Sequence, residues 1–339
     1  MSYLATPDDT TNRVIMRWCH DAPVDTDVAA QPARVDVLVV TWNTAHVTAQ
    51  ALRRLLDSEQ GDVVLRVLVH DNASSDGTPD VLATVVPEAE VVRGNDNLGF
   101  AGGINLLLAR STAPWLLVLN SDAWPDPGAV ARLLDAARRH QDVALVAPRL
   151  ESPDGRLELS AFAAPSVATA WGMALGVQTW APAWSARRLL PGAWQHDVPR
   201  EVEWAVGAAW LLRRDAVEAV GGLDTTFFMY GEDVEYCLRL RRSGWRVWFE
   251  PRAVVRHLGN ASGAQRYDGH ARAVAWVHND LLLFRRRASR PTTTAYAVGH
   301  ALGAGRAARS ARRRGDDETA AYWRALAAAY LTGARLRDD

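Results

Sequence analysis

Short apolar runs alternate with amphipathic stretches through the first half of the chain. From Arg34 onward, runs rich in β-branched residues, typical of buried strands, are each followed by a polar turn and a stretch of helical period. The predicted strands are 35–40, 63–69, 90–92, 115–119 and 143–147, and the predicted helices are 46–57, 78–85, 103–110 and 127–140. Because parallel strands need a crossover connection, this alternation predicts an α/β fold: a Rossmann-like, mostly parallel sheet with helices on both faces.

The pattern weakens at both ends of the chain and in its middle. Residues 1–33 mix Pro, Asp, Thr and Ala without period and predict an N-terminal arm without a fold of its own. Residues 151–203 are irregular and rich in Pro and Trp, which fits either a flap over an acceptor or a packed surface loop. The expected divisions are a domain over 34–265, its halves 34–147 and 148–265, and a basic C-terminal helical region over 266–339.

Polar side chains follow each of the first four predicted strands. Ligands of such sheets bind at the carboxyl ends of the strands, where these segments would meet. Each segment taken alone is typical of a turn or a helix cap, whereas four polar strand ends on one edge of a sheet predict a binding site. The segments are 41–43, 71–77, 93–99 and 120–122.

Glu232 and Asp233 follow the aromatic run 227–230 at the start of a predicted amphipathic helix. Acids in a first helical turn ordinarily stabilise the helix dipole by a few tenths to about 1 kcal/mol. The alternative is a general base, for which apolar neighbours would keep the pKa of a carboxylate near the working pH.

Five motifs, taken in their order along the chain, resemble glycosyltransferase family 2 and within it a bacterial rhamnosyltransferase-like subgroup. The motifs are 39–43, 71–78, 97–105, 119–122 and 231–235, and the resemblance covers roughly 34–288. It implies an inverting enzyme of GT-A fold that uses a nucleotide-sugar donor.

The same resemblance implies roles for individual residues. The nucleotide contacts would come from Thr41, Asn43, Asp71, Asn72, Arg93, Asn97, Gly99 and Asn105. The Asp-x-Asp metal motif of the family is here Asn120-Ser121-Asp122, so Asp122 would bind a divalent metal (Mg²⁺ or Mn²⁺) and Asn120 would be a neutral contact. His257 would be a further metal or diphosphate contact. Asp233 would be the general base, with Glu232 as the competing assignment.

The amino-acid composition excludes several enzyme classes and partners. All 38 basic Lys+Arg positions are arginine, which excludes Schiff-base enzymes, P-loop NTPases and protein kinases. A leaving diphosphate would then have to be stabilised by the metal, His257, Arg256 or Arg239. A net charge of −1 argues against a nucleic-acid partner, and two cysteines exclude a disulfide scaffold. No run of about 18 apolar residues occurs, so the expected location is cytoplasmic.

The C-terminal region adds a strongly basic segment. Residues 285–314 hold nine arginines and no acid, which fits a solvated helix or peripheral contact with an anionic membrane at its inner face. In the tail helix expected over 318–337, Tyr322, Leu326, Ala329 and Tyr330 recur at helical spacing, as for internal packing or a homodimer.

The function expected from these features is transfer of a sugar from a dTDP- or UDP-sugar to an acceptor hydroxyl. The sugar expected first is L-rhamnose or another deoxyhexose. The acceptor would be a saccharide, a lipid-linked saccharide or a small natural product. The alternatives are a non-catalytic nucleotide-sugar-binding protein and a sugar nucleotidyltransferase, the latter disfavoured because those enzymes depend on a lysine.

Overall fold

The computed structural model describes residues 31–58, 60–259 and 269–333. The described residues from Ala33 onward form one compact unit. The arm predicted over 1–33 lies almost wholly outside the described residues.

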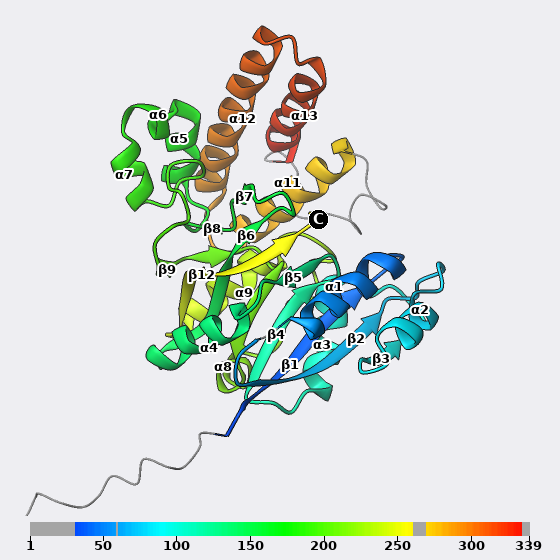
Figure 1. Ribbon diagram of the computed structural model, residues 1–339. Helices are drawn as coiled ribbons and strands as arrows, with labels where there is room; N and C mark the ends of the chain where they lie inside the picture. Colours follow the sequence, from blue (N-terminus) through cyan, green and yellow to red (C-terminus); the bar gives the residue numbers. More distant parts are fainter. Residues whose placement is uncertain (1–30, 59, 260–268, 334–339) are drawn as a thin grey trace, which may run out of the picture. The chain divides into compact units, whose positions relative to one another are not determined.

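The first half of this unit is a parallel sheet with helical crossovers (Figure 1). Four strands lie in the order β3-β2-β1-β4 and pair in parallel: β1 (Ala33–Thr41), β2 (Val63–Asp71), β3 (Glu90–Arg93) and β4 (Trp115–Asn120). The crossover helices are α1 (Ala45–Asp57), α2 (Thr78–Val85) and α3 (Gly99–Arg110). These elements follow the apolar pattern of the sequence, although α3 begins four residues earlier than its apolar period suggested.

The second half extends the same sheet. Its elements are β5 (Ala123–Pro125), α4 (Ala129–Arg139), β6 (Val143–Glu151), β11 (Ala209–Arg213), α8 (Arg214–Val220), α9 (Glu232–Arg242) and β12 (Arg246–His257). Strand β11 inserts antiparallel between β4 and β6, and β12 pairs in parallel with β6. Strands β1, β2, β3, β4, β6 and β12 therefore run in one direction, which confirms the expected mostly parallel α/β sheet, although the whole is mixed.

Both faces of the sheet are covered, which explains why its central strands are continuous apolar runs rather than alternating ones. In β4, Leu117 and Leu119 face one core with residues of α1 and α4, whereas Leu116 and Val118 face the other core with residues of α3, α8 and α9. All four side chains are fully buried. Packing on both faces therefore fixes the positions of the polar strand ends.

The segment expected to be irregular, 151–203, contains three short helices and several short strands. They are β7 (Leu157–Glu158), β8 (Ala161–Phe162), α5 (Val167–Leu175), α6 (Val177–Trp180), α7 (Pro182–Arg187) and β9 (Arg200–Val202), with β10 (Trp204–Ala205) just after. A capping box between Ser166 and Thr169 starts α5, and Gly176 ends it with a φ of 71°. Local capping therefore defines helices that have no clear apolar period.

Three further helices form the C-terminal region: α11 (Gly269–Arg285), α12 (Arg290–Arg313) and α13 (Asp317–Gly333). Tyr296, Leu326 and Tyr330 are buried in a separate core that these helices share with α5. The stripe predicted on the tail helix thus packs within the chain. None of the described helices is long and apolar enough to span a bilayer.

Candidate active site

The register of the sheet brings the polar strand ends together. Thr41 lies opposite Asp71 in the β1–β2 pair, and Val40 lies opposite Asn120 in the β1–β4 pair. A pocket of about 310 Å³ opens at this edge. Nine of the residues singled out from the sequence line it: Thr41, Asn72, Asn97, Gly99, Asn120, Asp122, Glu232, Asp233 and His257.

The loops after β1 and β2 are tied to each other at one side of the pocket. Asn43, with a φ of 51°, accepts a 2.8 Å hydrogen bond from the Ser75 N–H through Oδ1, and its own N–H donates to Ser74 Oγ at 2.8 Å. Asp76 accepts from the Ala45 N–H and so caps the start of α1. In this structure Asn43 therefore braces the two loops and does not line the pocket.

Thr41 lines the pocket, whereas Asp71, which lies opposite it in the sheet, is not among the lining residues. The Asp71 carboxylate accepts a 3.1 Å bond from the Ser74 N–H through Oδ2, while its Oδ1 is buried and has no hydrogen-bond partner among the described residues. The Thr41 hydroxyl is bonded to Thr44 and Thr48 at 2.9 Å each. A buried carboxylate oxygen without a partner is costly to the fold, so Asp71 Oδ1 requires an explanation beyond packing.

Asn72 holds the third loop. Its Nδ2 donates to the Gly99 carbonyl at 3.1 Å, and its Oδ1 accepts from the Leu98 N–H at 3.2 Å. Gly99 has a φ of 72°, and a Cβ there would overlap the Phe228 carbonyl oxygen. Only glycine allows the start of α3 to pack so closely on the segment that leads to the two acids.

Asp122 and His257 also line the pocket and contact each other. Asp122 Oδ1 lies 3.3 Å from His257 Nε2, Glu158 Oε2 lies 2.7 Å from His257 Nδ1, and Asn120 Nδ2 lies 3.4 Å from His257 Nε2. Burial alone would lower the pKa of His257, but its hydrogen bonds to Asp122 and Glu158 outweigh that effect and raise the pKa to about 9.

These residues fit a divalent metal shared with a donor diphosphate. Asp122 Oδ1 and His257 Nε2 converge on one point of the pocket, and a carboxylate on the far nitrogen of a histidine is the usual support for a metal ligand. Among the described residues no cluster of three His, Cys, Asp or Glu side chains forms a complete metal site. Ligands from the donor and water would therefore be needed to complete the coordination.

Glu232 and Asp233 stand at the N-terminus of α9, beside the turn before β11. Asp233 accepts from the Val234 N–H at 2.8 Å and from the Gly207 N–H at 3.4 Å, whereas Glu232 Oε2 is buried without a hydrogen-bond partner among the described residues. Burial raises the pKa of both carboxyls, and the Asp233 charge raises that of Glu232 further, to about 8. The backbone N–H groups favour the ionised form of Asp233, so Asp233 is the first of the pair to ionise and Glu232 keeps its proton near neutral pH.

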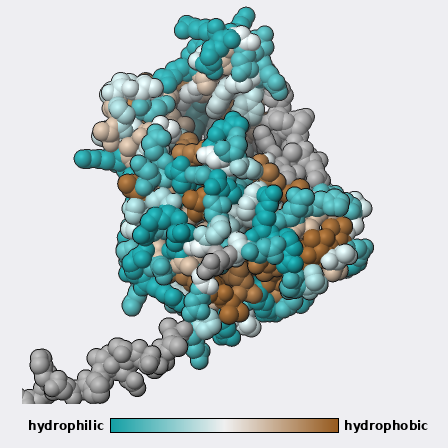
Figure 2. All heavy atoms as spheres, viewed as in Figure 1, coloured by the Kyte–Doolittle hydropathy of each residue, from teal (hydrophilic) through white to brown (hydrophobic). Residues whose placement is uncertain are grey.

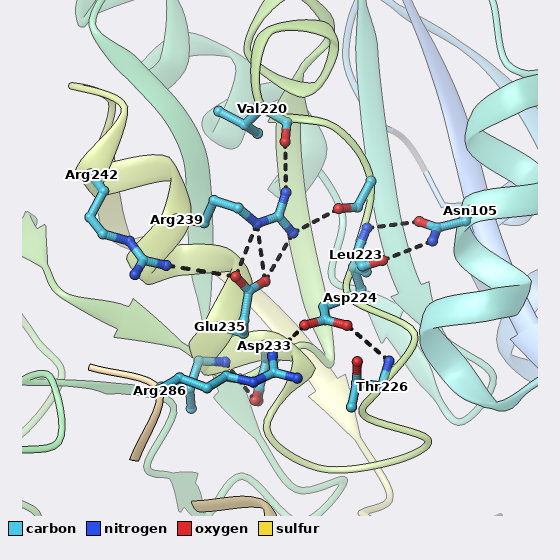
Figure 3. Close-up of polar contacts among 12 residues, drawn as sticks. Asn105, Val220, Leu223, Asp224, Thr226, Asp233, Glu235, Arg239, Arg242 and Arg286 are labelled. Atoms are coloured by element: carbon cyan, nitrogen blue, oxygen red, sulfur yellow. Dashed lines mark hydrogen bonds and ion pairs between the residues drawn. The ribbon is translucent and has the colours of Figure 1, made fainter. Parts of the chain in front are cut away.

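Polar contacts hold the segment before the acids (Figure 3). Arg239 donates to the Glu235 carboxylate at 2.9 Å and to the carbonyls of Val220 and Gly222 at 2.7 Å each. Both ends of the Asn105 amide bond to the Leu223 backbone at 2.8 Å. Asn105 and Arg239 therefore shape the loop between α8 and α9 and do not line the pocket.

Two further arginines singled out from the sequence also point elsewhere. Arg93 pairs with Asp80 at 2.5 Å on the exposed surface, and Arg256 pairs with Asp126 at 2.7 Å and Glu151 at 2.9 Å. No arginine is found among those lining residues that the structure describes. Of the cationic groups expected near a leaving diphosphate, the described pocket contains only His257.

Some residues of the site have no signal in the sequence. Glu158 lies in β7, within the segment expected to be irregular, and reaches His257 only because β7 pairs back onto β6. Asn279 of α11 donates to the carbonyls of Met229 and Tyr230 at 2.9 and 2.7 Å. Both contacts depend on tertiary structure, so no local pattern could have revealed them.

Comparison with known proteins agrees with this architecture. The model of the family described as glycosyl transferase family 2 matches residues 36–189. An N-acetylglucosaminyl-diphospho-decaprenol L-rhamnosyltransferase of Mycobacterium tuberculosis is 34% identical over 215 residues, which span 58% of this chain and 68% of that protein. A pre-mycofactocin glycosyltransferase of the same species is 34% identical over 233 residues, or 67% of this chain and 43% of that protein.

A solved structure with the same fold is the mannosyltransferase PcManGT from Pyrobaculum calidifontis in complex with GDP-Man and Mn²⁺. It matches with a TM-score of 0.54 at 20% identity, over 89% of this chain and 85% of that one. The expected GT-A fold is thereby confirmed. With the fold, the pocket at the strand ends and these relatives in agreement, the chain belongs to glycosyl transferase family 2 and is a glycosyltransferase.

Proposed function

We propose that the enzyme transfers L-rhamnose, or a closely related deoxyhexose, from a dTDP- or UDP-sugar to a hydroxyl of a lipid-diphosphate-linked saccharide, with inversion at the anomeric carbon. The rhamnosyltransferase relative supports both the sugar and the acceptor class. A lipid-linked acceptor would bring the enzyme to a membrane surface.

The buried acid pair carries this proposal. Asp233 lines the pocket, is held by backbone N–H groups, and has a neighbour in Glu232 that stays protonated near neutral pH. A carboxylate in that setting can take the proton of an acceptor hydroxyl as its oxygen attacks the anomeric carbon. The bond from the anomeric carbon to the donor diphosphate breaks in the same displacement, on the opposite face, so the configuration inverts.

The nucleotide would bind at the other end of the pocket. Asp71 Oδ1, buried and without a partner among the described residues, is an acceptor suited to the imide N–H of uracil or thymine. Asn72 and Gly99 fix the adjoining wall through their mutual hydrogen bond. This arrangement supports dTDP or UDP as the carrier.

Asp122 and His257 would hold the divalent metal, with Glu158 orienting the histidine ring. A bound Mg²⁺ or Mn²⁺ supplies positive charge that stabilises the leaving diphosphate. The protein residues supply the rest: they position the donor, exclude water from the buried acids, and hold the acceptor proton at Asp233.

The proposal is tested by incubating the purified enzyme with Mn²⁺ and a panel of nucleotide sugars. Each reaction also contains N-acetylglucosamine linked through diphosphate to a short isoprenoid. We expect dTDP-rhamnose to give the disaccharide product and to release dTDP. Transfer from a different nucleotide sugar only, or from none, would contradict the proposed donor.

A further inference from the structure

Helix α11 has two faces, and each packs against a different part of the chain. Residues three and four positions apart share one face of a helix. Val277, Leu281 and Phe284 form one such face and are buried in the core of the C-terminal helices. The outer end of α12 and α13 is mostly hydrophilic (Figure 2), as expected for helices whose apolar side chains pack within the chain. This core therefore holds α11 on one side.

A buried polar cluster strengthens the attachment of α11. The Tyr296 hydroxyl of α12 lies 2.9 Å from both carboxylate oxygens of Asp280, and the Tyr330 hydroxyl of α13 donates to the same carboxylate at 2.8 Å. A buried carboxylate is costly unless hydrogen bonds compensate for the lost water, so these two bonds have few alternatives. One residue of α11 is thus bonded to both neighbouring helices.

Asn279 lies on the other face of α11 and binds the backbone just before the acid pair. Its Nδ2 donates to the carbonyls of Met229 and Tyr230 at 2.9 and 2.7 Å. A Cβ at Gly231 would lie 3.4 Å from the Asn279 Cβ, so the side chain also packs directly on this glycine. Asn279 therefore contacts the three residues that precede Glu232.

The backbone held by Asn279 has an unusual shape. Tyr230 and Gly231 have φ angles of 70° and 100°, and a positive φ is rare for a bulky residue such as tyrosine. Such a conformation persists only where the surrounding structure determines it, and the two bonds from Asn279 have that effect. Gly231 precedes the first turn of α9, and its carbonyl accepts a 2.9 Å bond from the Glu235 N–H. The direction in which α9 begins, and with it the place of Asp233, depends on this turn.

Two further side chains on the same face of α11 hold the segment before Tyr230. Leu283 packs with Phe227 in a small buried core. Arg286 pairs with Asp224 at 2.6 Å, and its guanidinium carbon lies 5.1 Å from the centroid of the Phe227 ring (Figure 3). The spacing of Asn279, Leu283 and Arg286 is that of one helix face, so a single rigid element contacts the segment at three points.

We propose that Asn279 and Arg286 are positioning residues for Asp233. They bond to the segment that leads to the acid rather than to a substrate, and they transmit the fixed position of α11 to it. The inference rests on the proposed function, in which Asp233 takes the proton of the acceptor. It makes α11 a part of the transferase site rather than an appended helix.

The first test is Asn279→Leu in transfer assays with the full chain. The substitution keeps the branched shape of the side chain and removes both N–H groups of Nδ2. We expect kcat to fall about 10- to 100-fold, because displacement of a reacting group by about 1 Å can cost that much. The donor affinity in Mn²⁺, measured by calorimetry, should not change, since the proposed nucleotide and metal contacts lie at the strand ends.

Two other variants separate positioning from a general loss of stability. Ser166→Ala removes the capping box of α5 and should lower Tm, as the loss of a helix cap does, while kcat stays at the wild-type value. Asn279→Gln keeps the amide on a longer side chain and should recover part of kcat. Wild-type kcat in Asn279→Leu, or an equal fall of kcat in Ser166→Ala, would overturn the proposal.

Two neighbouring arginines supply a matched comparison. Arg286 bonds to Asp224, whereas Arg287 donates to the Pro165 carbonyl at 2.9 Å, just before α5. Arg286→Gln and Arg287→Gln therefore remove the same charge from adjacent positions with different contacts. We expect Arg286→Gln to lower kcat about three- to tenfold, as a smaller displacement of the segment would, and Arg287→Gln to resemble the wild type. Equal kcat values in the two variants would overturn the role of Arg286.

Hydrogen–deuterium exchange follows the segment without any substrate and separates this inference from the proposed function. Amides of residues 227–238 should exchange about tenfold faster in Asn279→Leu and at the wild-type rate in Ser166→Ala. Faster exchange in an enzyme that transfers no sugar from any donor would support the role of Asn279 and refute the proposed function. Unchanged exchange and kcat in Asn279→Leu, where the wild type transfers rhamnose, would refute the role of Asn279 and support the function.

Discussion

The Asp122 carboxylate lies 3.3 Å from Nε2 of His257, and both residues line the pocket at the ends of the strands. Strand pairing creates this contact, since His257 lies opposite Ala123 in the β12–β5 pair, next to Asp122. A histidine and an aspartate so placed can share a divalent ion with donor phosphates.

Removal of the carboxylate should therefore weaken donor binding only when metal is present. For Asp122→Ala we expect the affinity for dTDP-rhamnose in Mn²⁺ to fall about tenfold or more, because metal ligands of this kind contribute strongly to diphosphate binding. Binding in EDTA should hardly change. Calorimetry with and without Mn²⁺ measures both, and equal affinities for variant and wild type in Mn²⁺ would exclude Asp122 as a ligand.

The two acids should differ in their response to amide substitution. Asp233→Asn removes the proton acceptor and should lower kcat by about 10²- to 10⁴-fold while donor binding persists. Glu232→Gln replaces a protonated acid by a neutral amide of similar shape, so most of the activity near pH 7 should remain. The opposite pattern in steady-state kinetics would assign the base to Glu232.

Glu232 should also reduce the stability of the fold at alkaline pH. Its pKa is raised from the ordinary value of 4.5 to about 8 in the folded protein. Between these two pH values Glu232 is ionised in the unfolded chain but still protonated in the folded protein, which favours unfolding. The resulting loss of stability grows from about pH 4.5 to pH 8 and then stays constant. Glu232→Gln removes it and should stabilise the protein by roughly 1 to 4 kcal/mol at pH 8.

Thermal unfolding between pH 5 and 8.5 measures this effect. The excess in Tm of Glu232→Gln over the wild type should widen with rising pH. Glu218→Gln is the control, because the Glu218 side chain is 67% exposed. A Tm difference for Glu232→Gln that is independent of pH would show that burial does not raise the pKa of Glu232.

Gly99 offers a test of how the acid segment is positioned. A Cβ at Gly99 would overlap the Phe228 carbonyl oxygen, whereas a Cβ at Gly77, which also has a positive φ, would meet nothing within 4 Å. Gly77→Ala should therefore cost only about 1 kcal/mol of stability from its backbone conformation. Gly99→Ala should cost clearly more and also lower activity, as measured by denaturant unfolding and transfer assays. Equal costs for the two variants would contradict the close packing.

The first half of the fold could be predicted from the sequence because its physics is local. The apolar runs that form β1, β2 and β4 are bounded by turn residues, and parallel pairing then brings their polar ends to one edge. Placement of Thr41, Asn72 and Asp122 around one pocket follows from that rule and from the family motifs.

Long-range contacts set the limit of such prediction. Arg93 and Asn105 carry side chains suited to a ligand, yet Arg93 pairs with Asp80 and Asn105 with the Leu223 backbone. Glu158 shows the converse case, since its role beside His257 depends on β7 folding back onto β6. Neither outcome is encoded in spacing or composition.

The absence of lysine from the sequence limits which basic side chains could line the active site. Arg256 and Arg239 form ion pairs and carbonyl contacts away from the pocket, so among the residues that the structure describes no arginine lines the active site to stabilise a leaving diphosphate. The proposed reaction therefore depends on a metal at Asp122 and His257 more strongly than if a basic side chain lined the pocket.

The anomeric configuration of the product tests the central claim most directly. The enzyme, Mn²⁺, dTDP-rhamnose and the isoprenoid-linked acceptor are combined, and the product is examined by NMR beside a reaction with Asp233→Asn. We expect a glycosidic bond inverted relative to the donor in the wild type and no product from the variant. A product that retains the donor configuration, or full turnover by Asp233→Asn, would contradict single displacement with Asp233 as the base.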